Sequence, residues 1–102
     1  MKPDEINAAI AESLGWVDIE PIAKDGANWG REGGWDGSLL RVPNYHGSLD
    51  AIVPVVRALP MDERAGVVTQ LHVLMLHRPM FECYVATAAD WSEAYLRWKG
   101  LI

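Results

Sequence analysis

The chain has little of several residue types, and each shortage excludes a class of protein. It contains a single cysteine, Cys83, among 102 residues, so a disulfide framework within the chain is impossible. Cys83 lies in the apolar stretch Phe81–Val85 and is expected to be a buried, reduced thiol. Nine basic residues are set against fourteen acidic ones, for a net charge of -5. Because contacts to duplex phosphates need a basic face, we expect no duplex nucleic acid as a partner.

Long apolar runs are also missing. No segment approaches the roughly 20 apolar residues that a membrane-spanning helix needs. The first residues, Met1-Lys2-Pro3-Asp4-Glu5, lack the apolar stretch of a signal peptide. We therefore expect a cytoplasmic protein with no membrane partner.

No motif for metal binding, phosphate binding or catalysis is complete. His72 and His77 are five positions apart, whereas ligands on one helical face are three or four apart, so we predict no metal site. The glycines satisfy neither the dinucleotide-binding fingerprint nor the P-loop pattern. The sequence therefore predicts no cofactor and no enzymatic activity.

What is present fits one globular domain, because half of the residues are hydrophobic and the length is usual for a single domain. We predict one domain over residues 1–102. Four stretches have the apolar spacing and end signals of helices. These are Pro3–Leu14, a segment from the N-cap Ser48 to Pro60, a segment from Glu63 to about Leu76 with Asp62 as N-cap, and a segment from the capping box Thr87–Asp90 to Gly100.

Two of these helices carry an ambiguity. Pro54 lies too deep in the second segment for a first-turn proline, so a bend or a later start is expected there. The apolar run Val73–Leu76 is either the last turn of the third helix or a short strand. In the fourth helix, the aromatic residues Trp91, Tyr95 and Trp98 share one face, which indicates core or a subunit interface.

Three stretches have strand character, namely Trp16–Glu20, Leu39–Val42 and Phe81–Ala86. Between the first two, residues 24–38 predict a long loop, or a loose hairpin with Gly33-Gly34 near its turn. Helices mixed with a few short strands predict an α+β fold, with a small sheet of about three or more short strands covered by about four helices.

The stretch Asp25–Gly37 holds five of the nine glycines and two tryptophans. Tryptophans in such a stretch are costly if exposed, so they either pack on the protein's own sheet or a second subunit, or form a ligand platform. Aromatic faces stack nucleobases, arginine pairs with phosphate or carboxylate, and a helix start near Ser48 suits an anion. The candidate ligand-binding residues are Trp29, Arg31, Trp35, Arg41, Asn44, Tyr45 and His46.

A catalytic alternative involves His46 and Asp50, which lie four positions apart across the start of the second helix. A histidine held by a carboxylate is the beginning of an acid–base pair, with Ser48 between them. The same residues also suit an N-cap and a first-turn acid, and no Gly-x-Ser-x-Gly elbow is present. We therefore assign no catalytic residue and keep a small hydrolase using His46 and Asp50 as an alternative.

Three segments resemble a known family. Ile6–Trp16 is similar to an opening helix that ends in Gly-Trp, Val42–Ile52 to a Val-Pro-Asn-Tyr motif before a helix, and Ala86–Arg97 to a closing helix with Ala-Thr-Ala at its start and Glu-Ala-Tyr-Leu-Arg further on. Together they cover about a third of the chain and resemble the phage ABA sandwich domain, found in small proteins of tailed phages and prophages.

The resemblance implies an α/β/α sandwich of phage origin with no established catalytic activity. Small phage proteins of this sort are often accessory, and some counter host defence by binding a nucleotide signal without cleaving it. By this analogy, the leading hypothesis is a non-enzymatic homo-oligomer in the host cytoplasm that sequesters a nucleotide-derived signalling molecule of antiviral defence. A module that binds a host or phage protein, and the small hydrolase, are the alternatives.

Overall fold

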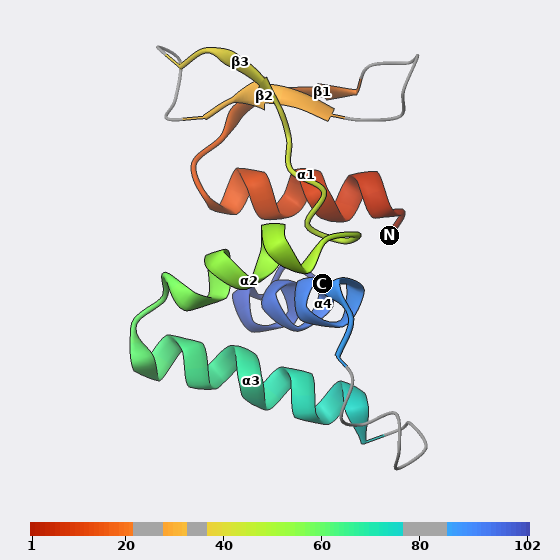
Figure 1. The fold of residues 1–102 in the computed structure, drawn as a ribbon, viewed down its shortest axis with the longest axis vertical. Helices are drawn as coiled ribbons and strands as arrows, with labels where there is room; N and C mark the ends of the chain where they lie inside the picture. Colours follow the sequence, from red (N-terminus) through yellow and green to blue (C-terminus); the bar gives the residue numbers. More distant parts are fainter. Residues whose placement is uncertain (22–27, 33–36, 77–85) are drawn as a thin grey trace. The chain divides into compact units, whose positions relative to one another are not determined.

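The computed structural model describes residues 1–21, 28–32, 37–76 and 86–102 (Figure 1). Its elements follow in the order α1, β1, β2, β3, α2, α3, α4. The described residues thus form a three-stranded antiparallel sheet and four helices, which confirms the predicted α+β class. The contacts divide the chain into two compact units, Met1–Asn44 and Tyr45–Ile102, and each unit is described by itself.

The first unit opens with α1, Pro3–Ser13, one residue shorter than predicted. Proline at the first helical position and acidic residues in the first turn both favour a helix start. At the other end Gly15 adopts a φ of 92°. The Trp16 amide donates to the Ala11 carbonyl and the Gly15 amide to the Glu12 carbonyl, each at 3.0 Å. This pair of bonds is a Schellman motif, which ends the helix and turns the chain into the sheet.

The sheet has the order β1-β2-β3, with β1 at Val17–Pro21, β2 at Asn28–Arg31 and β3 at Leu39–Arg41. Of the two predictions for residues 24–38, the hairpin is confirmed, because β2 pairs antiparallel with β3. The long loop is wrong for Asn28–Arg31. The expected turn residues Gly33-Gly34 lie outside the described residues.

The pairing of β1 with β2 is interrupted by a bulge. The register shifts between Val17 and Glu20, and Asp18 within this interval has a φ of 60°. Few residue types other than glycine occupy the left-handed region, and aspartate is one of those enriched there. The bulge therefore places a short acidic side chain at a point where the strand is re-aimed.

One face of the sheet lies against α1, as Figure 1 shows. On this face the Asn28 side-chain amide donates to the Asp4 carbonyl at 2.7 Å, which joins β2 to the first turn of α1. A β-carbon at Gly30 would lie 2.9 Å from Cγ1 of Ile19 and 3.3 Å from Cε3 of Trp16. The buried positions of β2 are thus Asn28 and Gly30, and because side chains alternate along a strand, Trp29 and Arg31 point to the opposite face.

The second unit begins with α2, Leu49–Arg57, and Pro54 lies inside it. The prediction of a later helix start at this proline is wrong. Proline removes the hydrogen bond to the carbonyl four residues earlier, here that of Asp50. Asp50 and Pro54 are both exposed, so water can satisfy that carbonyl. On the other face of the helix, the side chains of Ile52 and Val56 are buried and stabilise it.

Helix α3 spans Met61–Met75 and begins earlier than predicted. Pro60, not Asp62, is the N-cap residue, because its extended backbone already lets its carbonyl accept from the Arg64 amide at 2.9 Å. At the other end Val73 continues the helix and Leu76 is its C-cap, so the short-strand alternative for this run is wrong. The predicted strand Phe81–Ala86 and Cys83 lie outside the described residues, apart from Ala86.

Helix α4, Ala88–Lys99, has both predicted end signals. The Thr87 hydroxyl accepts from the Asp90 amide at 3.3 Å, and the Asp90 carboxylate accepts from the Thr87 amide at 2.8 Å. Gly100 ends the helix in the left-handed conformation. Tyr95 is buried, whereas Trp91 and Trp98 are half-buried. The middle of the aromatic stripe is therefore core.

Candidate functional site

The face of the sheet that points away from Asn28 and Gly30 brings together charged side chains and one tryptophan. Trp29 is paired with Glu20 on β1 and with Arg41 on β3, and Arg31 is paired with Leu39. Directly paired residues point to the same side of a sheet. We call this group the outer sheet face, made of Glu20, Trp29, Arg31, Leu39 and Arg41.

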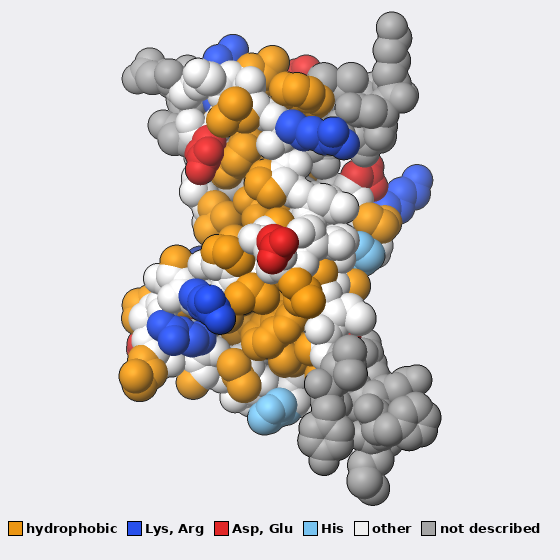
Figure 2. Space-filling view, in the orientation of Figure 1, with side chains coloured by type: hydrophobic (Ala, Val, Ile, Leu, Met, Phe, Trp, Pro, Cys, Tyr) orange, Lys and Arg blue, Asp and Glu red, His pale blue; other side chains and the backbone are white. Residues whose placement is uncertain are grey.

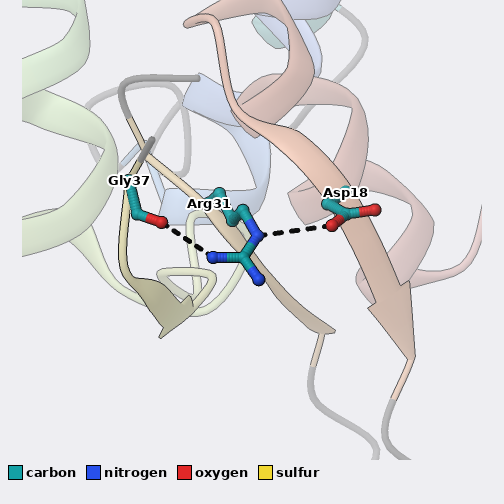
Figure 3. Close-up of polar contacts among 3 residues, drawn as sticks. All are labelled: Asp18, Arg31 and Gly37. Atoms are coloured by element: carbon teal, nitrogen blue, oxygen red, sulfur yellow. Dashed lines mark hydrogen bonds and ion pairs between the residues drawn. The ribbon is translucent and has the colours of Figure 1, made fainter. Parts of the chain in front are cut away.

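Arg31 is held in place by two partners (Figure 3). Its Nε donates to the Asp18 carboxylate at 3.3 Å, and its Nη1 donates to the Gly37 carbonyl at 2.9 Å. The bulge in β1 brings Asp18 within reach. In the part of the chain that the structure describes, Nη2 makes no hydrogen bond, so one donating edge of the guanidinium is oriented and available. Sequence reasoning missed both partners, because they lie 13 and 6 positions away in an irregular stretch.

Trp29 is half-buried, and its indole Nε1 is buried without a hydrogen-bond partner among the described residues. A buried donor left unsatisfied costs about 1–3 kcal/mol. Native proteins leave few such groups. The indole N–H is therefore a donor suited to an acceptor on a bound molecule or on a second subunit.

Arg41 lies on β3 directly opposite Trp29 and is exposed. Its guanidinium has no ion pair within the described ranges. β3 is an edge strand of three residues, and Leu39, two positions before Arg41, is 52% exposed. The outer sheet face thus combines a cation and an aromatic ring with apolar surface.

The remaining candidates are not all on this face. Asn44 is at the end of the first unit, where its Oδ1 accepts from the Asn7 amide at 3.1 Å. Tyr45 and His46 belong to the second unit. Tyr45 is only 4% exposed, and its carbonyl accepts from the buried Ser92 hydroxyl at 2.8 Å, so its ring is part of the packing. His46 is half-buried in the turn before α2. Trp35 lies outside the described residues.

The segment with the catalytic alternative surrounds an open hollow of about 560 Å³ in the second unit. The first residues of α2 and α4 line it, and Ser48 and Asp50 are among them. Ser48 is the N-cap residue of α2, although its side chain makes no capping hydrogen bond. Asp50 is an exposed residue of the first turn. Both residues therefore have the helix-start positions that the sequence analysis weighed against catalysis.

Among the described residues, no group of three or more histidine, cysteine or carboxylate side chains is arranged to hold a metal ion. His72 is exposed on α3, and His77 lies outside the described residues. No helix in the described ranges is both long enough and apolar enough to cross a membrane.

Comparison with protein-family models, with curated proteins and with solved structures finds no match to this chain. The resemblance to the phage ABA sandwich domain accordingly rests on the three sequence segments that carry it. Its implied α/β/α layering stays a prediction.

Proposed function

We propose that this chain is a non-enzymatic phage accessory protein that binds and sequesters a small, nucleotide-derived signalling molecule of host antiviral defence. It would act in the host cytoplasm as a homo-oligomer. The phage context comes from the family resemblance. The binding chemistry comes from the outer sheet face.

The observation that carries the proposal is the pairing of Trp29 with Arg41 across β2 and β3. An indole face can stack on a nucleobase, which contributes about 1–3 kcal/mol per base. A guanidinium next to it can take up a phosphate with charge-assisted hydrogen bonds. The indole N–H of Trp29, which has no partner among the described residues, adds a donor for a polar edge of the ligand.

Arg31 supports the same proposal in a different way. Because Asp18 and Gly37 already hold two of its nitrogens, its Nη2 edge is oriented before any ligand arrives. A side chain ordered in advance loses less entropy on binding. Arg31 and Arg41 are neighbours on one face, two residues apart in register, so they can contact two phosphates or two oxygens of one phosphate.

The same face offers little for turnover. Its described ionisable groups are Glu20, Arg31 and Arg41, with Asp18 in an ion pair with Arg31, and no described histidine, serine or cysteine is among the residues that make up this face. His46 and Asp50, the residues of the hydrolase alternative, belong to the other unit. We therefore propose binding without cleavage.

Isothermal titration calorimetry with cyclic dinucleotides and ADP-ribose derivatives tests the proposal. Trp29→Ala is expected to weaken binding at least about tenfold, the lower part of the stacking range. Trp29→Phe keeps a ring and restores part of the affinity. Arg41→Gln weakens binding and Arg41→Lys less so, while the charge-matched Arg97→Gln on α4 leaves it unchanged. Ligand recovered intact after denaturation is the expected end state.

Two results would overturn the proposal. No binding of any of these nucleotides, together with a host protein retained through the outer sheet face, favours the protein–protein module; exposed Leu39 on the edge strand fits that alternative. Conversion of the ligand that is lost in His46→Ala favours the hydrolase.

A further inference from the structure

The second unit contains an apolar cleft apart from the outer sheet face. Its volume is about 300 Å³, which is the lower end of the range for small-molecule sites. Figure 2 shows hydrophobic side chains gathered over the helices of this unit, with basic side chains beside them. The lining residues are Val53, Val56, Arg57, Arg64, Val68 and Trp91.

The positions of the arginines and valines along the cleft follow from helix geometry. On α2, Val53 and Arg57 are four positions apart, and on α3, Arg64 and Val68 are four positions apart. Residues at this spacing lie one above the other on a helix face. Arg57 is the last residue of α2 and Arg64 is in the first turn of α3. Both arginines therefore lie at the end of the cleft next to the turn of residues 58–60.

The valines and Trp91 make the rest of the lining. Val53, Val68 and Trp91 are half-buried, so the packing of α2, α3 and α4 does not close this surface. One end of the cleft is cationic and the other is aliphatic and aromatic. This polarity distinguishes it from a gap in the core, which would be apolar throughout.

The two arginines differ in their hydrogen bonds. Arg64 Nη2 donates to the Arg57 and Leu59 carbonyls, each at 3.2 Å, so its guanidinium is fixed across the turn and its Nε and Nη1 are left over. Arg57 is exposed, and its guanidinium has no partner within the described residues. The cleft thus presents one fixed and one adjustable cation at the same end.

We propose that this cleft binds a small amphipathic carboxylate, a molecule with an apolar acyl or aromatic body and one anionic group. The apolar body of the ligand contacts the side chains of Val53, Val68 and Trp91. Its carboxylate pairs with Arg57 and with the remaining nitrogens of Arg64. A volume of 300 Å³ equals that of about ten water molecules in the liquid, which suits a short chain or a single ring. Apart from the two arginines and the indole N–H of Trp91, the lining is aliphatic, so it suits an apolar body with one anionic group better than the many polar edges of a nucleotide.

Octanoate is a suitable probe, and 1-octanol has the same length of chain without the charge. Titration of the ¹⁵N-labelled chain is expected to shift the amide resonances of Val53 and Val68 and the indole resonance of Trp91. Octanol should produce the same pattern with an affinity about tenfold lower, since it lacks the charge-assisted bonds that are roughly twice as strong as neutral ones.

Variants test separately how the positive charge and the apolar lining of the cleft contribute to binding. Arg57→Gln should lower octanoate affinity about tenfold, with no change for octanol, and Arg57→Lys should recover part of the loss. Val53→Phe fills the cleft and should abolish binding of both probes. The control Arg97→Gln, on the exposed surface of α4, should bind octanoate as the parent does. A retained spectrum outside the cleft shows that each variant folds.

Three results would overturn the proposal. The first is the absence of shifts at Val53, Val68 and Trp91 up to the solubility limit of octanoate. The second is equal binding of octanoate and octanol that Arg57→Gln leaves unchanged. The third is binding of an acidic peptide with leucine side chains at these residues while octanoate does not bind, which would identify a protein partner instead. The test is independent of the proposed nucleotide site, because all six lining residues belong to the unit Tyr45–Ile102.

Discussion

The indole of Trp98 lies against the backbone of Gly66, so closely that a β-carbon at Gly66 would be 2.7 Å from both Cδ1 and Nε1 of the ring. Gly66 is in the interior of α3, and Trp98 is on α4. Glycine inside a helix costs about 1 kcal/mol relative to alanine, and here the missing side chain lets the two helices approach.

Gly66→Ala sets two effects against each other. Helix propensity favours alanine by about 1 kcal/mol, whereas overpacking costs about 1–3 kcal/mol. We expect a net loss of stability of about 1 kcal/mol, measured by urea unfolding. In a Trp98→Leu background the ring is gone, and Gly66→Ala should become stabilising. Equal effects in both backgrounds would contradict the contact.

Thr87→Ala removes the hydroxyl that caps α4. Loss of such a cap typically costs about 1 kcal/mol, and urea unfolding should show a decrease of this size. Ser48→Ala is the matched control, because Ser48 occupies the N-cap of α2 without a side-chain capping bond. The control should change stability by less than about 0.5 kcal/mol. A loss as large as that of Thr87→Ala would mean that Ser48 also caps in solution.

Asn28→Ala removes the 2.7 Å bond from the buried side-chain amide to the Asp4 carbonyl. A bond of this kind contributes about 0.5–1.5 kcal/mol, and truncation of the buried side chain adds to the loss. We expect a decrease of about 1–2 kcal/mol in the unfolding free energy. Asn44→Ala removes an exposed bond to Asn7 and is expected to have a smaller effect. Hydrogen exchange of β2 amides should rise in Asn28→Ala.

Asp18 combines a positive φ with an exposed ion pair to Arg31. Asp18→Gly relieves the backbone while it removes the carboxylate, and such surface pairs contribute at most about 1 kcal/mol. Its stability should stay close to that of the parent. Asp18→Val forces a β-branched residue into the left-handed region, with a loss of about 1–2 kcal/mol. Thermal unfolding compares the stability of the two variants. Equal losses would show that the ion pair, not the backbone conformation, determines the contribution of Asp18 to stability.

Elements whose end signals are local were predictable from the sequence. Pro3 and Gly15 bound α1, and Thr87 and Gly100 bound α4, because caps involve residues within one turn. The start of α3 was misplaced, because Pro60 supplies the N-cap backbone before Asp62 can. The later helix start predicted from Pro54 is wrong for a different reason. The free energy gained by burying the opposite face of α2 exceeds the cost of one lost hydrogen bond.

The candidate site was predictable in composition but not in arrangement. Asparagine and glycine have low strand propensity, so the alternation in Asn28–Arg31 indicated a loop as readily as a strand. Only the register places Trp29 beside Arg41. Tyr45 was predicted on the same platform, yet it is buried, and its carbonyl accepts from Ser92, 47 residues later, a contact that local sequence does not encode.

The contact between Asn28 and Asp4 also determines which way the tryptophan faces. A slip of one residue in the pairing of β2 would exchange the two faces of the strand, turning Trp29 towards α1 and Asn28 outward. In that register a full side chain would occupy the position of Gly30, where even a β-carbon would be 2.9 Å from Ile19. The wrong register thus loses the hydrogen bond to α1 and gains a steric clash with Ile19 of β1. The packing of α1 and β1 on one side of the sheet therefore selects the orientation of the aromatic ring on the other.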